Sequence, residues 1–305
     1  MNLDLWSVLV AVLGGAIRVS TPFLFVSLGE CVTEKSGRIN LGLEGTLVFG
    51  AMAGYGGSLL TGNPWFGVLA AGIAGTLFGL LHGAICSLKG VNDVAVGIAL
   101  MIFGTGLAFF FGKPLIQPAA PMLQPIDLGF WTSDPALRAA LQINPLFIVG
   151  IAIAFAMGFA FRRTRTGLIL RMVGDSADAA RAMGYPIVPV RIAATMFGGF
   201  MAGVGGAYLS LYYPGSWNEG ISSGQGLIAV ALVIFARWNP VACFGAALLF
   251  GGAGALGPAL QSVGVTGGTY LFYAAPYVLT LLILILTSSP RRALEGAPRE
   301  LSITK

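Results

Sequence analysis

Long apolar runs, separated by short polar or charged segments, follow one another along almost the whole chain. Most contain about 20 residues, the length that a helix needs to cross the ~30 Å hydrocarbon core of a bilayer. The candidate spans are residues 5–28, 41–60, 65–88, 94–112, 145–161, 192–213, 222–236, 240–260 and 271–288. Because Ser20, Thr21 and Pro22 interrupt the first run and the seventh run is short, eight to ten spans fit the pattern.

These runs predict helices, not strands. A membrane β-barrel needs segments of about ten residues that alternate apolar and polar positions, whereas the stretch LLILIL at 281–286 does not alternate. The composition agrees with a polytopic protein, since 56% of the residues are hydrophobic, 10% are charged and the mean hydropathy is +0.85. The predicted fold class is all-α: a polytopic membrane helical bundle of about nine transmembrane segments, forming one domain over residues 1–305.

Basic residues predict the orientation of the chain, because they are enriched in cytoplasmic loops. The segment 162–191 contains Arg162, Arg163, Arg165, Arg171, Arg181 and Arg191, and the tail 289–305 contains Arg291, Arg292, Arg299 and Lys305. We expect both segments in the cytoplasm, the loop 113–144 outside and, with nine spans, the N-terminus outside. This loop bias explains the net charge of +5, so the charge does not indicate nucleic-acid binding. No cleavable signal peptide is expected, because the first residues lack a basic region.

Two charged residues fall within apolar surroundings. Arg18 lies in the middle of the first run, where a charge costs about 2.5–3.5 kcal/mol on insertion scales and should face protein, water or a carboxylate. Glu44 lies in the segment SGRINLGLEG at 36–45, where the second run begins. We therefore predict Glu44 as the partner of Arg18. A structural arginine at a helix break is the alternative.

The segment 36–45 predicts a broken or re-entrant start to the second span. Ser36 and Gly37 permit a turn, Asn40 is placed to cap a helix, and Glu44 would lie in its first turn, where the helix dipole favours a negative charge. In transporters, irregular polar backbone at membrane depth often marks the substrate path. Asn40 and Glu44 are therefore candidate path residues, unless the segment lies at the aqueous interface and merely starts a helix.

The region 212–226, with the sequence YYPGSWNEGISSGQG, is predicted to return from an external loop into the seventh span. Aromatic faces and amides suit a planar nucleobase or a sugar, so Trp217, Asn218 and Glu219 are further candidates for the substrate path. The alternative is that these aromatic residues anchor an ordinary membrane interface.

Histidine and cysteine positions predict neither a metal site nor a cofactor. His82 is the only histidine and lies in a glycine-spaced run between Gly75 and Gly83, which favours a packed helix residue over a proton relay. The cysteines are Cys31, Cys86 and Cys243. They are dispersed in or beside apolar runs, so we expect small core residues and no disulfide.

The basic inner segment contains a predicted short helix. Asp175 or Ser176 can cap a helix over 177–183, Gly184 suits its C-terminal turn, and Pro186 forbids continuation. An exposed helix of this kind suits recognition in a groove of a partner protein. The alternative is a surface connector between two spans.

One spacing in this segment resembles the EAA coupling loop of ABC importer permeases, with aspartate replacing the first glutamate. It is D-A-A-x-x-x-G, formed by Asp178, Ala179, Ala180 and Gly184. Three further stretches are similar to blocks of permeases of the branched-chain amino acid and simple-sugar class: TEKSGRINLGLEGTLVFGAMAG (33–54), VALVIFARWNP (230–240) and APYVLTLLIL (275–284). The resemblance is greatest to bacterial nucleoside-type subunits and covers residues 18–285. The stretch VNDVAVG (91–97) departs from the Asp-Gln pair more frequent in nucleoside-type relatives, which leaves the substrate open.

The resemblance implies a permease subunit of an ABC importer in the bacterial inner membrane. It would translocate a small polar solute, with nucleosides or nucleobases expected first and simple sugars next. The implied partners, besides the lipid bilayer, are a cytoplasmic ABC ATPase, a second permease subunit, homologous or identical, and an extracytoplasmic substrate-binding protein or lipoprotein. The coupling residues toward the ATPase would be Asp175, Asp178, Ala179, Ala180 and Gly184.

The chain itself is not expected to be an enzyme. Its only Gly-Lys pair, Gly112-Lys113, is followed by Pro114, so the G-x-x-x-x-G-K-[ST] phosphate loop is absent. A membrane enzyme would also need a catalytic constellation that one histidine and few buried acids do not supply. The remaining alternative is an ion-coupled secondary transporter, for which Glu44 would be the coupling carboxylate.

A weak internal sequence similarity between two parts of the chain predicts an inverted repeat. SGRINLGLEG followed by NPWFGVLAAGIAGTLFG (63–79) parallels SGQGLIAVAL (223–232) followed by NPVACFGAALLFGG (239–252). The two Asn-Pro pairs fall on opposite sides of the predicted membrane, as an inverted repeat requires. Chance similarity between sequences rich in Gly, Ala and Leu is the alternative.

Overall fold

The computed structural model describes residues 5–262, 272, 274–287 and 296–302, and these are mostly helical. The long helices are α1 (Leu5–Lys35), α2 (Leu43–Thr61), α3 (Pro64–Ile85), α4 (Asp93–Gly112), α6 (Pro145–Arg163), α9 (Ile187–Leu211) and α11 (Pro240–Ser262). The shorter helices are α5 (Pro135–Ala140), α7 (Arg165–Asp175), α8 (Ala177–Ala182), α10 (Gln225–Phe235) and α13 (Ala275–Thr287), with 3-10 turns η1 (Lys113–Leu115) and η2 (Arg299–Ser302). Strands β1 (Ile126–Asp127) and β2 (Gln142–Ile143) form one small antiparallel pair.

The predicted helical membrane bundle is confirmed, but the predicted number of nine spans is not. Six helices in the described part of the chain are long and apolar enough to cross a membrane. The seventh predicted span is the 11-residue helix α10, which covers only about 16 Å and cannot cross alone. The last predicted span, 271–288, lies partly outside the described residues, which contain α13.

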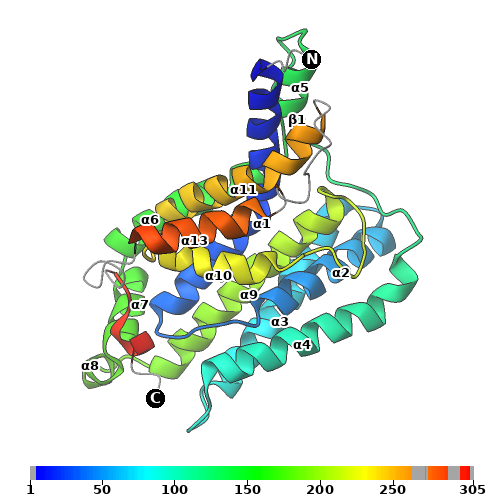
Figure 1. Ribbon diagram of the computed structural model, residues 1–305. Helices are drawn as coiled ribbons and strands as arrows, with labels where there is room; N and C mark the ends of the chain where they lie inside the picture. Colours follow the sequence, from blue (N-terminus) through cyan, green and yellow to red (C-terminus); the bar gives the residue numbers. More distant parts are fainter. Residues whose placement is uncertain (1–4, 263–271, 273, 288–295, 303–305) are drawn as a thin grey trace.

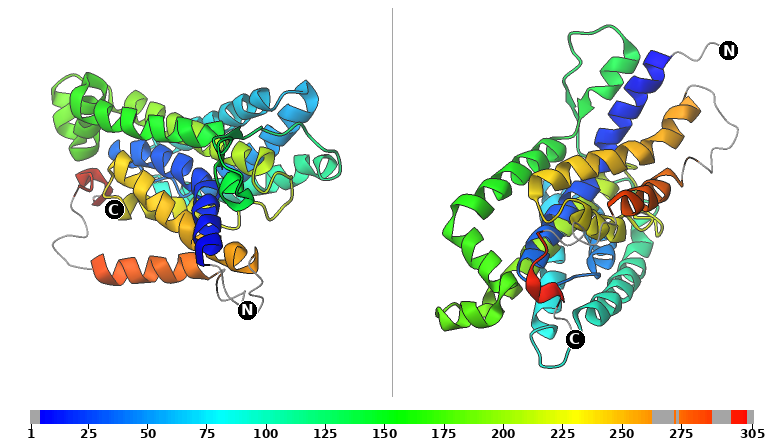
Figure 2. Two further views of the ribbon diagram at one scale, coloured as in Figure 1. Left: turned by 90° about the horizontal axis from the view of Figure 1, so that it is seen from above. Right: turned by 60° about the vertical axis from the view of Figure 1, so that its left-hand side comes forward.

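Two helices, α1 and α9, lie at the centre of the bundle and contact each other, while α4 and α6 lie on opposite flanks (Figures 1 and 2). Helix α1 packs along α11, and α9 packs along α3. In Figure 1, α1 descends from the N-terminus whereas α9 rises from the opposite end. The two central helices therefore run in opposite directions, and each packs along one helix of the other half of the chain.

Small residues permit the close approach of these helix pairs. A Cβ atom at Gly79 of α3 would lie 2.1 Å from the Thr195 carbonyl oxygen of α9. Likewise, a Cβ atom at Gly251 of α11 would lie 2.6 Å from the Ala16 carbonyl oxygen of α1. In a membrane, helices associate mainly through such close packing and through polar contacts.

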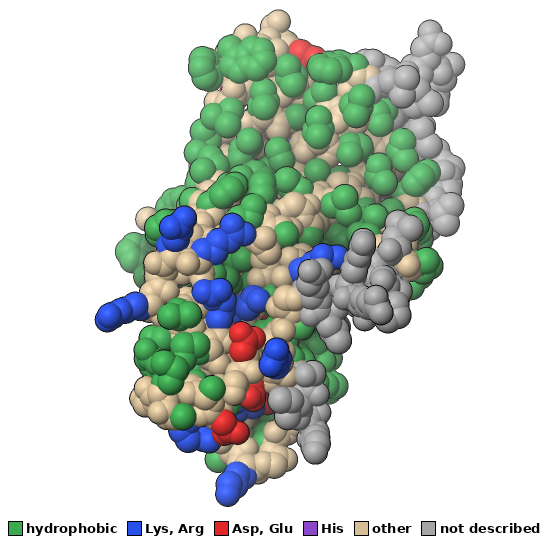
Figure 3. Space-filling model, turned by 90° about the vertical axis from the view of Figure 1, so that its left-hand side faces the viewer, with side chains coloured by type: hydrophobic (Ala, Val, Ile, Leu, Met, Phe, Trp, Pro, Cys, Tyr) green, Lys and Arg blue, Asp and Glu red, His purple; other side chains and the backbone are tan. Residues whose placement is uncertain are grey.

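The two ends of the bundle differ in composition. The N-terminus lies at one end with α5, and α7, α8 and the C-terminal segment lie at the other (Figure 1). Figure 3 shows one side of the molecule, on which charged side chains gather toward the second end and the opposite part is mainly apolar. The segment 162–191 and the described residues 296–302 of the predicted cytoplasmic tail therefore lie at the same end, which we refer to as the inner end; Arg291, Arg292 and Lys305 of that tail lie outside the described residues.

Candidate functional site

The segment 36–42, which joins α1 to α2, is not helical and is largely buried. The Asn40 N–H donates to Glu30 Oε1 at 2.8 Å, and the Asn40 side chain accepts from the Gly42 N–H at 2.9 Å. The prediction of Asn40 as the helix cap is wrong, because the N-cap residue of α2 is Gly42, which makes no side-chain capping bond. Asn40 instead closes a turn immediately before the helix.

Glu44 lies in the first turn of α2, as predicted, and is buried. Its carboxylate accepts from Ser222 Oγ at 2.6 Å, from the Gly224 N–H at 3.1 Å and from the Gly226 N–H at 2.6 Å. These donors belong to the start of α10, whose own N-cap residue Gly224 offers no side chain. Glu44 therefore supplies to α10 the negative charge and the acceptors that an N-capping side chain would give.

The predicted pairing of Arg18 with Glu44 is wrong. Arg18 Nη2 donates to the Ala139 carbonyl oxygen at 2.5 Å, in the last turn of α5. A cation at that position satisfies a carbonyl that the helix leaves without a partner. Glu44 is satisfied by α10, so the two charges stabilise different short helices.

The structure separates the three candidates in the external loop. Trp217 is buried and its Nε1 donates to the Gly112 carbonyl oxygen at 2.8 Å, which fastens the loop to the end of α4. Asn218 and Glu219 are exposed. The loop then continues to Ser222, whose hydroxyl donates to Glu44. The segment that leads into α2 and the segment that leads into α10 therefore end at the same point.

This meeting point of α2 and α10 lies deep within the bundle. After α10, the indole Nε1 of Trp238 donates to Glu34, in the last turn of α1 at the inner end. Since α10 is about 16 Å long and the hydrocarbon core is ~30 Å thick, its start beside Glu44 falls about half-way across. A cavity of about 620 Å³ lies between this level and the inner end. Its lining includes Glu34, Leu41, Val94, Ile234, Trp238 and Leu301.

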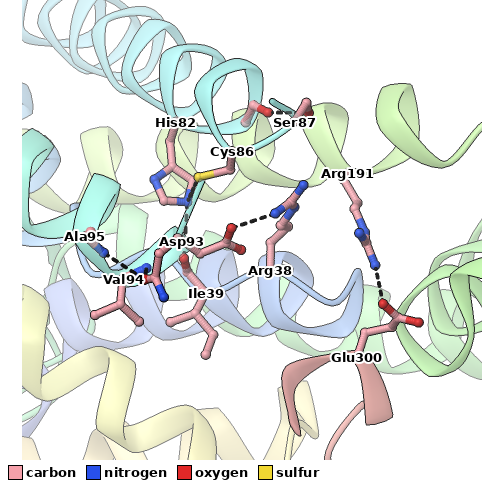
Figure 4. A network of polar contacts seen from close by, with 12 residues as sticks. Arg38, Ile39, His82, Cys86, Ser87, Asp93, Val94, Ala95, Arg191 and Glu300 are labelled. Carbon is pink, nitrogen blue, oxygen red and sulfur yellow. Dashed lines mark hydrogen bonds and ion pairs between the residues drawn. The ribbon is translucent and has the colours of Figure 1, made fainter. Parts of the chain in front are cut away.

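A buried polar network surrounds the segment 36–42, and the sequence interpretation missed most of it (Figure 4). Arg38 Nη1 pairs with Asp93 Oδ1 at 2.6 Å, which joins the segment to the start of α4. His82 Nε2 lies 3.1 Å from the Ile39 carbonyl oxygen, so the histidine is packed, as expected, and also joins α3 to the segment. Burial raises the pKa of the neighbouring Cys86 thiol to about 12 and keeps it protonated. The sequence did offer a signal for the ion pair, because Arg38 and Asp93 are oppositely charged residues that each lie just before an apolar run.

The buried carboxylates Glu30 and Glu34 were also missed, because the first span was expected to end at residue 28 and α1 continues to Lys35. The extension adds two helical turns that carry both acids. Among the described residues, Glu30 Oε2 has no hydrogen-bond partner, whereas Glu34 accepts from Trp238. The acids therefore face the interior of the bundle between the segment 36–42 and the stretch after α10.

The predicted short helix in the basic segment is α8, capped by Ser176, whose hydroxyl accepts from the Ala179 N–H at 3.2 Å. Gly184 follows with a φ of +83°, as its predicted turn requires. Asp175 is the last residue of α7, an amphipathic helix that the sequence interpretation missed. Asp178, Ala179 and Gly184 are exposed.

Ala180 is the exception among the predicted coupling residues. It is buried against Val173 of α7 and Ile187 of α9 and therefore anchors α8 to the bundle. The outer face of α8 is left open, with Met183 66% exposed. The helix thus forms a projection at the inner end that is fixed on one side and accessible on the other.

Buried helices that are interrupted near the middle of the membrane are features typical of membrane transport proteins. The chain belongs to the family described as branched-chain amino acid transport system / permease component, which matches residues 12–287. It is 30% identical over 302 residues to the guanosine ABC transporter permease protein NupQ of Bacillus subtilis, covering 92% of this chain and 93% of that protein.

Two further relatives each cover more than three quarters of the chain. The nucleoside ABC transporter permease protein NupC of Lactococcus lactis is 29% identical over 290 residues, covering 88% of this chain and 89% of that protein. A provisionally named glucose ABC transporter permease protein of Haloferax volcanii is 34% identical over 246 residues, covering 78% of this chain and 74% of that protein. The chain is therefore a permease subunit of an ABC transporter and a multi-pass protein of the inner membrane. The resemblance seen in the sequence is confirmed, and an ion-coupled transporter is not supported.

Proposed function

We propose that this chain forms part of the translocation path of an ABC importer for nucleosides. The proposed substrate class is supported by the share of the chain that aligns with its relatives, because the guanosine and nucleoside permeases match 92% and 88% of the chain. A sugar is the second candidate, favoured by the 34% identity to the glucose permease over 78% of the chain.

We propose the meeting point of α2 and α10 as the central part of the path. Glu44 joins the two re-entrant segments there, Asn40 closes the turn that precedes α2, and the cavity toward the inner end gives the solute a space to leave. Trp217 positions the external loop, and the exposed Asn218 and Glu219 are available to a solute or a binding protein. In transporters, solutes cross where discontinuous helices meet near the middle of the membrane.

We propose that α8 docks into a groove of a separate ATPase subunit and that this chain hydrolyses no ATP itself. The sequence lacks a phosphate loop, and α8 projects at the inner end with Asp178, Ala179 and Gly184 exposed. A second permease subunit would complete the pore, and an extracytoplasmic binding protein would deliver the solute to the opposite end.

The substrate is tested by uptake into proteoliposomes. The chain is co-purified with the transport subunits encoded beside it and reconstituted into proteoliposomes. Vesicles that contain ATP in the lumen are compared with vesicles that lack it. Labelled guanosine or labelled glucose is then added outside. We expect ATP-dependent guanosine uptake that excess unlabelled guanosine removes and excess glucose does not. Glucose uptake alone would favour the second candidate, and uptake without ATP would contradict the ABC mechanism.

A further inference from the structure

The carboxylate of Glu300, in the C-terminal turn η2, bonds to two other elements at the inner end. Its Oε1 accepts from the Ala177 N–H at the start of α8 at 2.9 Å, and its Oε2 pairs with Arg191 Nη2 of α9 at 3.2 Å. The Glu300 and Arg191 side chains are only 21% and 13% exposed, so water screens their pairing weakly. Figure 4 shows the Arg191–Glu300 pair beside the network around Arg38.

The same arginine bonds to the re-entrant segment. Arg191 Nε donates to the Ser36 carbonyl oxygen at 3.1 Å, and Nη2 also reaches the Val173 carbonyl oxygen of α7 at 3.5 Å. A planar guanidinium can hold these acceptors at once because its donors point in fixed directions. Arg191 thus bonds both to Glu300 and to the segment 36–42.

The segment 36–42 carries the connection to the middle of the membrane. Arg38 in this segment pairs with Asp93 of α4, and the segment ends at α2, where Glu44 bonds to the start of α10. The C-terminal residues also line the 620 Å³ cavity, through Ala297 and Leu301 among others. A displacement of Glu300 would therefore act on both the segment and the inner boundary of the cavity.

We propose that Glu300 and Arg191 are positioning residues that transmit movement of α8 to the segment 36–42 and so open the inner end of the path. This proposal rests on the docking of the ATPase at α8. When α8 moves, Glu300 moves with the Ala177 N–H, and Arg191 cannot keep its bonds to both Glu300 and Ser36. The segment 36–42 is then released from the position in which it holds α2 against α10.

The test uses the complete transporter in nanodiscs and a reporter that needs no solute. The three native cysteines, buried in the structure, are replaced by alanine, and Val94→Cys places one thiol in the lining of the inner cavity. Its rate of reaction with a water-soluble maleimide is compared without nucleotide and with ATP plus vanadate, in the parent, in Glu300→Gln and in Arg191→Lys.

We expect the nucleotide-dependent change in labelling to fall by at least about fivefold in both variants, while ATP hydrolysis and co-elution of the ATPase persist. In Glu300→Gln, the amide offers only one oxygen acceptor to the Ala177 N–H and the Arg191 guanidinium. In Arg191→Lys, the charge is kept, but a single ammonium group cannot bond to both the Ser36 carbonyl oxygen and Glu300. Asp127→Asn is the matched control, since it removes an ion pair to Arg138 at the opposite end, and should keep the full response.

Two results would overturn the relay. The first is an unchanged labelling response in both variants. The second is loss of the ATPase from Glu300→Gln, which would mean that the carboxylate merely supports α8. Docking is measured in a separate experiment, as the release of the ATPase caused by Gly184→Asp. If that variant keeps the ATPase, the docking proposal fails; if it releases the ATPase but the labelling response is unchanged in Glu300→Gln and Arg191→Lys, only the relay fails.

Discussion

Glu44 stabilises the start of a helix other than its own, through three donors of the stretch 222–226. Buried carboxylates of this kind are tolerated because their oxygens accept several hydrogen bonds. The residue therefore determines how two re-entrant segments meet, a role that its charge alone did not reveal.

We predict that Glu44→Gln destabilises the subunit by about 2 kcal/mol, the range for a hydrogen bond to a charged group. The amide nitrogen would face a backbone N–H of α10, leaving one buried donor without an acceptor. Thermal unfolding in detergent measures the loss, and solute uptake should fall with it. The exposed Glu219→Gln makes the same chemical change and should leave the melting temperature unchanged; an equal loss of stability in the two variants would refute the assignment.

Asp127 gives a residue-scale prediction on pH. Hydrogen bonds from Arg138, followed by that from the Gly129 N–H, hold the pKa of Asp127 below its usual value. A lowered folded-state pKa stabilises the fold above the unfolded value of about 3.9 and loses this contribution as the pH falls through the folded value. The melting temperature of Asp127→Asn should therefore depend less on pH in that acidic range. Parallel curves for variant and parent would contradict this.

At the scale of elements, the contact between α3 and α9 depends on the absence of a side chain at Gly79. We predict that Gly79→Ala destabilises the bundle by about 1–3 kcal/mol, as overpacking does, because the added Cβ would lie 2.1 Å from the Thr195 carbonyl oxygen. Gly106 of α4 is the control, since nothing lies within 4 Å of its added Cβ. Gly106→Ala should be neutral or stabilising, because alanine favours helix. Chemical denaturation in mixed micelles compares the two.

The elements also show where local patterns are sufficient. The cap, length and C-terminal turn of α8 were predictable from Ser176, Gly184 and Pro186, because capping is decided by neighbours in sequence. Helix α7 was missed because an 11-residue amphipathic helix among arginines resembles a polar loop by composition. Helix α1 is longer than its apolar run, because its last two turns bury acids against other elements that composition does not identify.

At the scale of the whole molecule, the assembly is tested at α8. We predict that Gly184→Asp lowers the amount of ATPase that co-purifies by at least about tenfold, equivalent to 1.4 kcal/mol of binding. The control is Gly90→Asp, at another open glycine with positive φ near the inner end, +78° against +83° for Gly184. Both variants add the same charge and the same backbone strain. Only the first should affect assembly, so an equal loss from both would exclude a specific docking site.

The amino-acid sequence by itself determined the membrane class, the order of the apolar helices, the projecting helix α8 and the permease family. The class, the order of the helices and α8 follow from hydropathy, segment length and capping patterns, which are properties of neighbouring residues, whereas the family followed from the resemblance of four stretches to known permeases. The tertiary structure alone decided the partners of the polar side chains. Glu44 bonds to Ser222 across 178 residues, Arg18 to Ala139 across 121, and Arg191 to Glu300 across 109. Such partners depend on which helices pack together, and the pattern of any single segment contains no information about that choice.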